Sequence, residues 1–267
     1  MTIEELCEGI GLPPHITEQV RLNADHFDFR FLDVLRKDFY DYESARKIHT
    51  VIEPICGDDP NHTKILSCML YMSAFTYDIY QEKGIPDEIY FATMKCYSRF
   101  LLETFQRTGQ WRFDRFWWTA RQAGAHLFRI GELEYEIRRF PEHVTIGIHI
   151  PSDANLLPPA VDASLDSARC FFASYYPEVS ECDYICHSWL MDTQLRQLLS
   201  APSNILNFQK RFHIYDMGEE SEDAFSWIFQ TEKKRIEDFP EATALQRSTK
   251  EFLLAGGVLR DSYGLLR

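Results

Sequence analysis

The chain has 267 residues, 45% of them hydrophobic, which is enough for a substantial core in one or two domains. Its formal net charge of −13 excludes nucleic acid as an expected partner, because a phosphate backbone is bound by a basic surface. No run approaches the roughly 18 apolar residues of a membrane span and the acidic start MTIEELCEGIG is unlike a secretory signal, so we expect a cytoplasmic protein.

The first part of the chain is predicted to be helical. Apolar residues between Ile65 and Ile79 recur at nearly helical spacing, and this segment is expected to end at Gly84. A further helix is expected from Pro86 to Gly109. These patterns predict a helical N-terminal domain over residues 1–110, followed by a second domain over residues 111–267.

The hydrophobic period changes after residue 124. The segments HLFRIGELEYEIRRF (126–140) and HVTIGIHIP (143–151) alternate apolar and polar residues and predict three strands with short connections, hence an antiparallel meander. Gly147 inside the third strand indicates a bulge or a close backbone approach. Glu134 and Glu136 lie on one face of the second strand, a pattern typical of an exposed sheet face that would also attract a cationic amine.

A crossover follows the meander. The stretch IHIPSDANLLPPAVDASLDSARCFF (148–172) joins the third strand to a helix with one apolar face, and DYICHSWLMD (183–192) is predicted to be a buried strand. A strand, a helix and a strand form a crossover, so the two strands are expected to be parallel. SNILNFQKRF then predicts a short helix and RFHIYDM a strand, whereas the tail over residues 222–259 is predicted to be helices and turns.

This order of elements resembles the GNAT-type N-acyltransferases over roughly residues 112–217. The stretch 148–172, YICHSWLMD, SNILNFQKRF and TALQRSTKEFLLAGG (243–257) resemble more closely a family of GNAT-like acyltransferases that carry a helical N-terminal domain. The resemblance implies an α+β fold, with that helical domain packed on a GNAT-like mixed-sheet α/β domain. It also implies transfer of an acyl group from acetyl-CoA, a longer acyl-CoA or a carrier thioester to a small-molecule amine.

The resemblance places the acyl-CoA at the loop before the crossover helix. In typical GNAT enzymes, backbone N–H groups of a glycine-containing loop hold the pyrophosphate at the helix start, where unpaired donors and a partial positive charge favour an anion. The corresponding cofactor-binding residues are Ile150, Ser152, Asn155, Leu156 and Ala160.

The residues of this loop depart from the typical motif. The loop contains no glycine, and Pro158 and Pro159 have no N–H to offer. We therefore expect a ligand slot whose pyrophosphate is bound elsewhere or not at all. Typical GNAT enzymes also carry a tyrosine that protonates the leaving thiolate, and the matching position here is Phe208.

Four residues are candidates for the chemistry and the acceptor. His187, in the strand that would border the acyl slot, is a candidate general acid or base, since imidazole titrates near neutral pH. By resemblance, Glu136 is the candidate for deprotonating the amine. His149 and Ser188 are candidate substrate-binding residues. The alternatives are a buried structural histidine at 187, a solvated carboxylate at 136 and a solvent-facing histidine at 149.

No metal is expected. Cys182, Cys186 and His187 form the most compact cluster of possible ligands, but they lack the C-x₂-C pairs of a structural zinc site. The alternative to an enzyme is a non-catalytic GNAT-like module that binds a small molecule or a protein. The oligomeric state is left open by the sequence.

Overall fold

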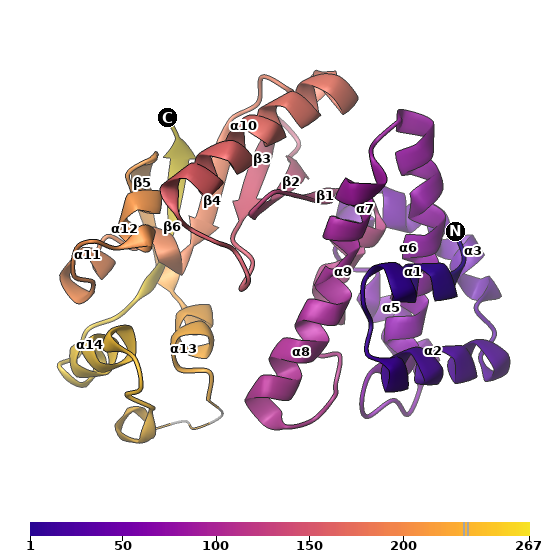
Figure 1. The fold of residues 1–267 in the computed structure, drawn as a ribbon, viewed down its shortest axis with the longest axis horizontal. Coiled ribbons are helices and arrows are strands. Elements are labelled where there is room, and N and C mark those ends of the chain that lie inside the picture. Colours follow the sequence, from indigo (N-terminus) through magenta and orange to yellow (C-terminus); the bar gives the residue numbers. More distant parts are fainter. Residues whose placement is uncertain (232, 234) are drawn as a thin grey trace.

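The computed structural model describes residues 1–267 except 232 and 234. Residues 1–124 form a helical unit that lies beside a sheet domain (Figure 1). The helices of this unit are α1 (Ile3–Gly9), α2 (Pro14–His26), α3 (Arg30–Tyr40), α4 (Tyr42–Ala45), α5 (His49–Cys56), α6 (Thr63–Lys83), α7 (Asp87–Met94), α8 (Cys96–Thr108) and α9 (Phe116–Ala123).

The long helix α6 is the centre of the helical unit. Eleven of its side chains are buried, and it ends as predicted at Gly84, which adopts φ 70°. The single helix predicted from Pro86 to Gly109 is wrong, because the chain breaks at Lys95 into α7 and α8. The break belongs to the docking of α7 on the sheet, where the Thr93 hydroxyl accepts a hydrogen bond from the Arg129 backbone N–H.

The sheet has six strands in the order β1-β2-β3-β4-β6-β5 among the described residues. The predicted meander is confirmed, since β1, β2 and β3 pair antiparallel, and so is the parallel pairing of β3 with β4. The strands are β1 (Leu127–Ile130), β2 (Leu133–Arg139), β3 (Val144–His149), β4 (Tyr184–Ser188), β5 (Phe212–Glu220) and β6 (Arg260–Leu266).

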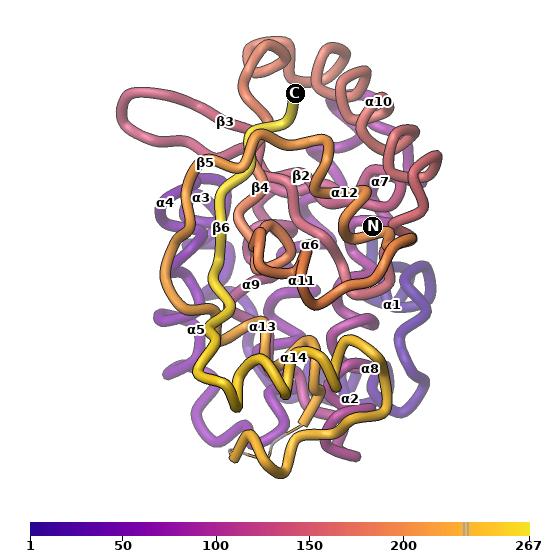
Figure 2. Tube along the Cα trace, turned by 90° about the vertical axis from the view of Figure 1, so that its left-hand side faces the viewer, coloured from indigo at the N-terminus to yellow at the C-terminus, as the bar shows by residue number. Residues whose placement is uncertain are grey.

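The last strand was not predicted. β6 inserts between β4 and β5 and pairs antiparallel with both, as the yellow segment beside β5 in Figure 2 shows. The prediction of helices and turns for residues 222–259 holds where the structure describes them, whereas residues 232 and 234 lie outside the described residues and no prediction covered the segment 260–266. No local pattern marks this strand, because its pairing partners lie about 50 and 75 residues earlier in the chain.

Helices cover the sheet differently on its two faces. The crossover helix α10 (Pro158–Tyr175) packs on one face, where Phe172 meets Phe128, Tyr135 and Tyr184. The opposite face is turned toward the helical unit (Figure 1). The remaining elements are η1 (Pro177–Val179), η2 (Trp189–Met191), α11 (Leu195–Leu198), α12 (Asn204–Gln209), α13 (Glu222–Phe229), η3 (Ile236–Asp238) and α14 (Ala244–Leu254).

Candidate active site

The parallel strands β3 and β4 separate near their carboxyl ends. Their register runs from Ile146 opposite Tyr184 to Ile148 opposite Cys186, and no later pair joins them within the described chain. β3 continues to His149 and β4 to Ser188. The two predicted site residues His149 and His187 therefore follow directly after the point where the strands part.

Strand alternation places three predicted residues on the same face. Successive side chains of a strand point to opposite faces, and the register aligns Glu136 with Gly147 and His187 with Tyr263. Since Tyr135 and Tyr184 contact α10, Glu136, His149 and His187 lie on the opposite face, toward the helical unit. The structure thus brings these three candidates to one side of the sheet.

Gly147 allows this face to be polar and close-packed. The register of β3 is continuous through Gly147 on both sides, so no bulge occurs there. A Cβ at this position would lie 2.4 Å from Nε of Arg138. Of the two predicted explanations for the glycine, the close approach is the one that the structure contains.

Glu136 is the hub of a buried ion-pair network. Its Oε1 accepts hydrogen bonds from Nη1 of Arg46 at 2.9 Å and Nε of Arg121 at 3.2 Å. Its Oε2 accepts from Nε of Arg138 at 3.1 Å and from His149 Nε2 at 2.9 Å. The residue is fully buried, so the expected solvent-exposed acidic face is wrong at this strand.

The charges around Glu136 keep it ionised. Burial alone would raise the pKa of this carboxyl, but the hydrogen bond and charge of His149, followed by Arg121 and Arg138, hold the pKa well below its usual 4.5. All four partners donate hydrogen bonds to Glu136, and the ionised carboxylate can accept all of them. Glu136 therefore binds and orients neighbours at any pH near neutrality.

His149 is held in one tautomer by Glu136. Because the carboxylate can only accept, Nε2 of His149 carries the hydrogen, and Nδ1 is left with its lone pair when the ring is neutral. The edge of the Trp118 indole packs against the ring, with centroids 4.9 Å apart. Burial lowers the pKa of His149 from 6.5 in spite of the carboxylate, so the neutral form is favoured.

His187 has a different environment on the same face. Its ring stacks on Tyr263 of β6, with centroids 3.9 Å apart and planes at 10°. The side chain is half-buried, and burial lowers its pKa from 6.5 against the opposing effect of Asp261. Among the described residues, no side chain or backbone group makes a hydrogen bond to either ring nitrogen. His187 is therefore a neutral imidazole with unused nitrogen atoms.

The hydroxyl of Ser188 is hydrogen-bonded within the protein, and residue 208 is a phenylalanine without a hydroxyl. Oγ of Ser188 accepts a hydrogen bond from the Leu190 N–H and caps η2. Phe208 of α12 is fully buried and packs on Phe212 at 5.0 Å. The nearest phenol to His187 is that of Tyr263, which the sequence did not single out.

The first turn of α10 offers no free backbone donor. Pro158 and Pro159 are its first two residues and have no N–H. The N–H groups of Ala160 and Val161 both donate to the carbonyl of Leu157, at 3.0 and 3.1 Å. These backbone groups are therefore used within the helix start, and the expectation that a pyrophosphate is bound elsewhere or not at all stays a prediction.

Polar groups of the loop before α10 are bound within the protein. Ser152 Oγ donates a hydrogen bond to Glu103 of α8, and the Asn155 N–H donates to Glu132 at 2.8 Å. Ile150 and Leu156 are partly buried against the core. The five predicted cofactor-binding residues thus lie together at the carboxyl end of β3, where the helical unit meets the loop.

Asp153 fastens this loop to two buried arginines. Its Oδ1 lies 2.9 Å from Nη1 of Arg129 and 3.4 Å from Nη1 of Arg99. Arg99 reaches on to Glu134, at 2.7 Å, which joins the loop to the polar sheet face. The pKa of Asp153 is lowered, because the two guanidinium groups outweigh its partial burial.

Sequence reasoning did not identify the cationic half of the network. Its members come from separate helices and strands, and no spacing in the sequence connects them. A prediction that Glu136 is buried between the helical unit and the sheet would have indicated them, because a buried carboxylate needs cations around it. The residues missed are Arg46, Arg99, Arg121, Arg138, Trp118 and Tyr263.

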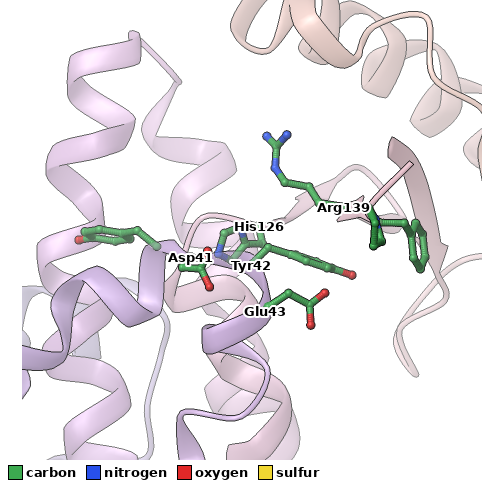
Figure 3. Close-up of a pocket in the computed structure, with 8 residues that line it drawn as sticks. Asp41, Tyr42, Glu43, His126 and Arg139 are labelled. Atoms are coloured by element: carbon green, nitrogen blue, oxygen red, sulfur yellow. The ribbon is translucent and has the colours of Figure 1, made fainter. Parts of the chain in front are cut away.

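A surface hollow borders the network at Tyr42, whose hydroxyl accepts a hydrogen bond from Nη1 of Arg46 at 2.8 Å. It has a volume of about 470 Å³ and lies where α3 and α4 meet the turn between β2 and β3 (Figure 3). It contains none of the predicted site residues. Its lining combines acidic, basic and aromatic side chains, namely Tyr40, Asp41, Tyr42, Glu43, His126, Arg139, Phe140 and Pro141.

Neither a metal-binding cluster nor a membrane-spanning helix is found among the described residues. No cluster of three or more histidine, cysteine or carboxylate side chains is arranged to hold a metal ion in this part of the chain. Among the helices of the same residues, none has the length and apolar character needed to cross a membrane.

The comparisons with known proteins agree on the architecture. An N-acyltransferase N-terminal domain matches residues 1–124, and a GNAT-like C-terminal domain matches residues 127–266. No curated protein matches the sequence. The predicted division of the chain after residue 110 stays a prediction.

Similar solved structures extend over nearly the whole chain. An acyltransferase in complex with decanoyl-CoA and teicoplanin is 21% identical, with a TM-score of 0.83 over 98% of this chain and 86% of the other. A mutant acyltransferase in complex with octanoyl-CoA is 21% identical, with a TM-score of 0.78 and the same coverage. An acyltransferase in complex with CoA and 10C-teicoplanin is 20% identical, with a TM-score of 0.72 over 100% and 99%. At these identities the likeness shows the fold.

Proposed function

The chain belongs to the family that joins an N-acyltransferase N-terminal domain to a GNAT-like C-terminal domain, and we propose that it transfers an acyl group from acyl-CoA to an amine. The observation that carries the proposal is the position of His187. It presents a neutral imidazole with unused nitrogens directly after the point where β3 and β4 separate. A general base in an acyl transfer needs these properties.

In the proposed reaction His187 accepts a proton from the acceptor. The amine nitrogen attacks the thioester carbonyl, a C–N bond forms, and the C–S bond breaks as the thiolate of coenzyme A leaves. His187 takes the proton that the nitrogen loses, and the thiolate takes up a proton as the cycle closes. With Phe208 buried, the phenol of Tyr263 beside His187 is the proposed source of that proton, and the protonated His187 returns its proton to Tyr263 to close the cycle.

Glu136 acts through His149 in this proposal. Its low pKa makes it a weak base, but its four donors fix the floor of the site. His149 and Trp118 pack edge to face beside that floor. We propose that the acceptor binds beside His149 and Trp118 on this face, whereas strand alternation points Ser188 to the α10 face.

The donor is proposed from the family and from the solved relatives. Those acyltransferases were crystallised with octanoyl-CoA, decanoyl-CoA or CoA, one of them also with teicoplanin and one with 10C-teicoplanin. We propose a medium-chain acyl-CoA and a small-molecule amine for this chain. The proposal includes no metal ion.

The test is a thiol-release assay with the purified full chain. Acetyl-, octanoyl- and decanoyl-CoA are offered with a panel of primary amines, and free thiol and acylated product are measured together. His187→Ala is expected to lower kcat by about 100-fold or more, as for loss of a general base. The matched control is His143→Ala, an exposed histidine in the β2–β3 turn that stacks on Phe140.

The second candidate is a non-catalytic module, which the engaged loop before α10 favours. This candidate predicts that no acyl-CoA raises the melting temperature and that His187→Ala changes no measured property. Absence of any shift in the melting temperature with all the acyl-CoAs would favour this candidate, and acylated product formed with any of the amines would exclude it.

A further inference from the structure

An acyl-CoA that bound this chain would need a cation for its phosphates. The first turn of α10 has no free N–H group, and the arginines that touch the loop are already used. Arg129 donates to the Gly131 carbonyl at 2.7 Å and to Asp153. Arg99 donates to Glu134 at 2.7 Å. The phosphate-binding group must therefore be sought beside the loop.

Arg115 is the cation beside the loop that keeps its donors. It precedes α9, and among the described residues its guanidinium makes no hydrogen bond. Within the described part of the chain it pairs with Oε2 of Glu103, 3.7 Å from Nη1, which is beyond hydrogen-bonding distance. Glu103 in turn accepts a hydrogen bond from Ser152. One side chain thus separates Arg115 from the loop.

The contact with Trp227 leaves the N–H groups of Arg115 available. Cζ of Arg115 lies 4.3 Å from the centroid of the Trp227 ring in α13, a helix on the side of the sheet domain that faces the helical unit (Figure 1). A guanidinium that places its face on an aromatic ring keeps the donors at its edge, and this fork matches a phosphate. The side chain is 30% exposed, so a ligand can reach it.

Glu103, the carboxyl that pairs with Arg115, competes only weakly with a phosphate for the guanidinium. Burial raises the pKa of Glu103, although Ser152, Arg115 and Arg99 oppose this effect. A phosphate oxygen can come within hydrogen-bonding distance, whereas Glu103 remains outside it.

We propose that Arg115 binds a phosphate group of the acyl-CoA donor, in place of the backbone N–H groups that the prolines remove from α10. The site then combines both domains, because Arg115 belongs to the helical unit and Trp227 to the sheet domain. This inference rests on the proposed function, since it assigns a residue to the donor of that reaction.

The experiment compares donors with and without phosphates. Binding of octanoyl-CoA to the full chain is measured by calorimetry for the wild type, Arg115→Gln and Arg115→Lys. Activity is measured with octanoyl-CoA and with the octanoyl thioester of N-acetylcysteamine, which has no phosphate. Arg169→Gln, an exposed arginine of α10 paired with Asp166, is the matched control.

Arg115→Gln is expected to weaken octanoyl-CoA binding by about 10- to 100-fold, as for loss of charge-assisted hydrogen bonds. Arg115→Lys keeps the charge and is expected to lose less. The KM for the phosphate-free thioester should be unchanged in both variants, and 3′-dephospho-CoA shows whether the pyrophosphate or the 3′-phosphate is bound.

Two results separate the inference from the proposed function. If the wild type binds no acyl-CoA, the proposed function fails and the assignment fails with it. If the wild type binds octanoyl-CoA and Arg115→Gln binds it equally well, only the assignment is overturned. An equal loss with the phosphate-free thioester would also overturn it, because Arg115 would then contact the acceptor or support the fold.

Discussion

Two halves of one sheet face differ in how their polar side chains are used. On β2 and β3 this face lies under the helical unit, where Glu134 and Glu136 pair with Arg46, Arg99 and Arg121 and His149 is hydrogen-bonded to Glu136. On β4 and β6 the same face carries His187, whose ring nitrogens have no bond within the described chain, stacked on Tyr263.

The difference shows what the helical unit does to the sheet. A buried carboxylate is tolerated only when cations and donors surround it, and the helices supply them. The β2–β3 half has thereby become a rigid support. The β4–β6 half keeps His187, whose ring nitrogens have no hydrogen-bond partner among the described residues. The reaction is therefore proposed for the boundary between the two halves.

Removing the hub of the support should have the largest effect. Glu136→Ala leaves the buried Arg121 and the partly exposed Arg46 and Arg138 without their shared carboxylate, so we expect a loss of about 3–5 kcal/mol in the free energy of unfolding. Urea denaturation followed by circular dichroism measures it. Glu18→Ala, which removes a fully exposed carboxylate paired with Arg21, should change little. Equal effects of the two substitutions would mean that the network is not a support.

The two histidines should respond in opposite ways. His149→Ala removes a charge-assisted hydrogen bond to Glu136 and should lower stability by about 1.5–3 kcal/mol. His187→Ala should leave stability nearly unchanged while it abolishes most of the activity. Unfolding and rate measurements on the same preparations test the contrast, and a larger stability loss at His187 would reverse the assignment.

Acid should weaken both halves. The pKa of His149 and that of His187 are lowered from 6.5, so below pH 6.5 the unfolded chain binds these protons more readily than the folded protein. The free energy of unfolding should then fall by up to about 1.4 kcal/mol per pH unit for each histidine. Nuclear magnetic resonance titration of the two imidazoles should give midpoints below 6.5, and a midpoint above that value contradicts the prediction.

Removing the ion pairs between Asp153 and its two arginines should have the smallest effect on stability. Asp153→Asn removes a half-exposed charge from Arg129 and Arg99, with an expected cost of about 0.5–1 kcal/mol and faster hydrogen exchange in the loop before α10. The control Asp166→Asn removes an exposed ion pair within α10. If loop exchange is unaffected by Asp153→Asn, the loop is held by other contacts.

Much of the fold could be predicted because its signals are local. The meander, the crossover helix and the end of α6 at Gly84 follow from alternation, helical spacing and a glycine in the left-handed conformation. β6 could not be predicted in this way, because its pairing with β4 and β5 depends on segments far away in the chain.

The candidate site shows the same division between local signals in the sequence and long-range packing. The absence of an N–H group from Pro158 and Pro159 can be read from the sequence, because that property is covalent. The burial of Glu136, the hydrogen bond of His149 to Glu136 and the lack of a hydrogen-bond partner for His187 among the described residues appear only in the folded chain. Those states depend on which helices cover each half of the sheet, and long-range packing alone sets that coverage.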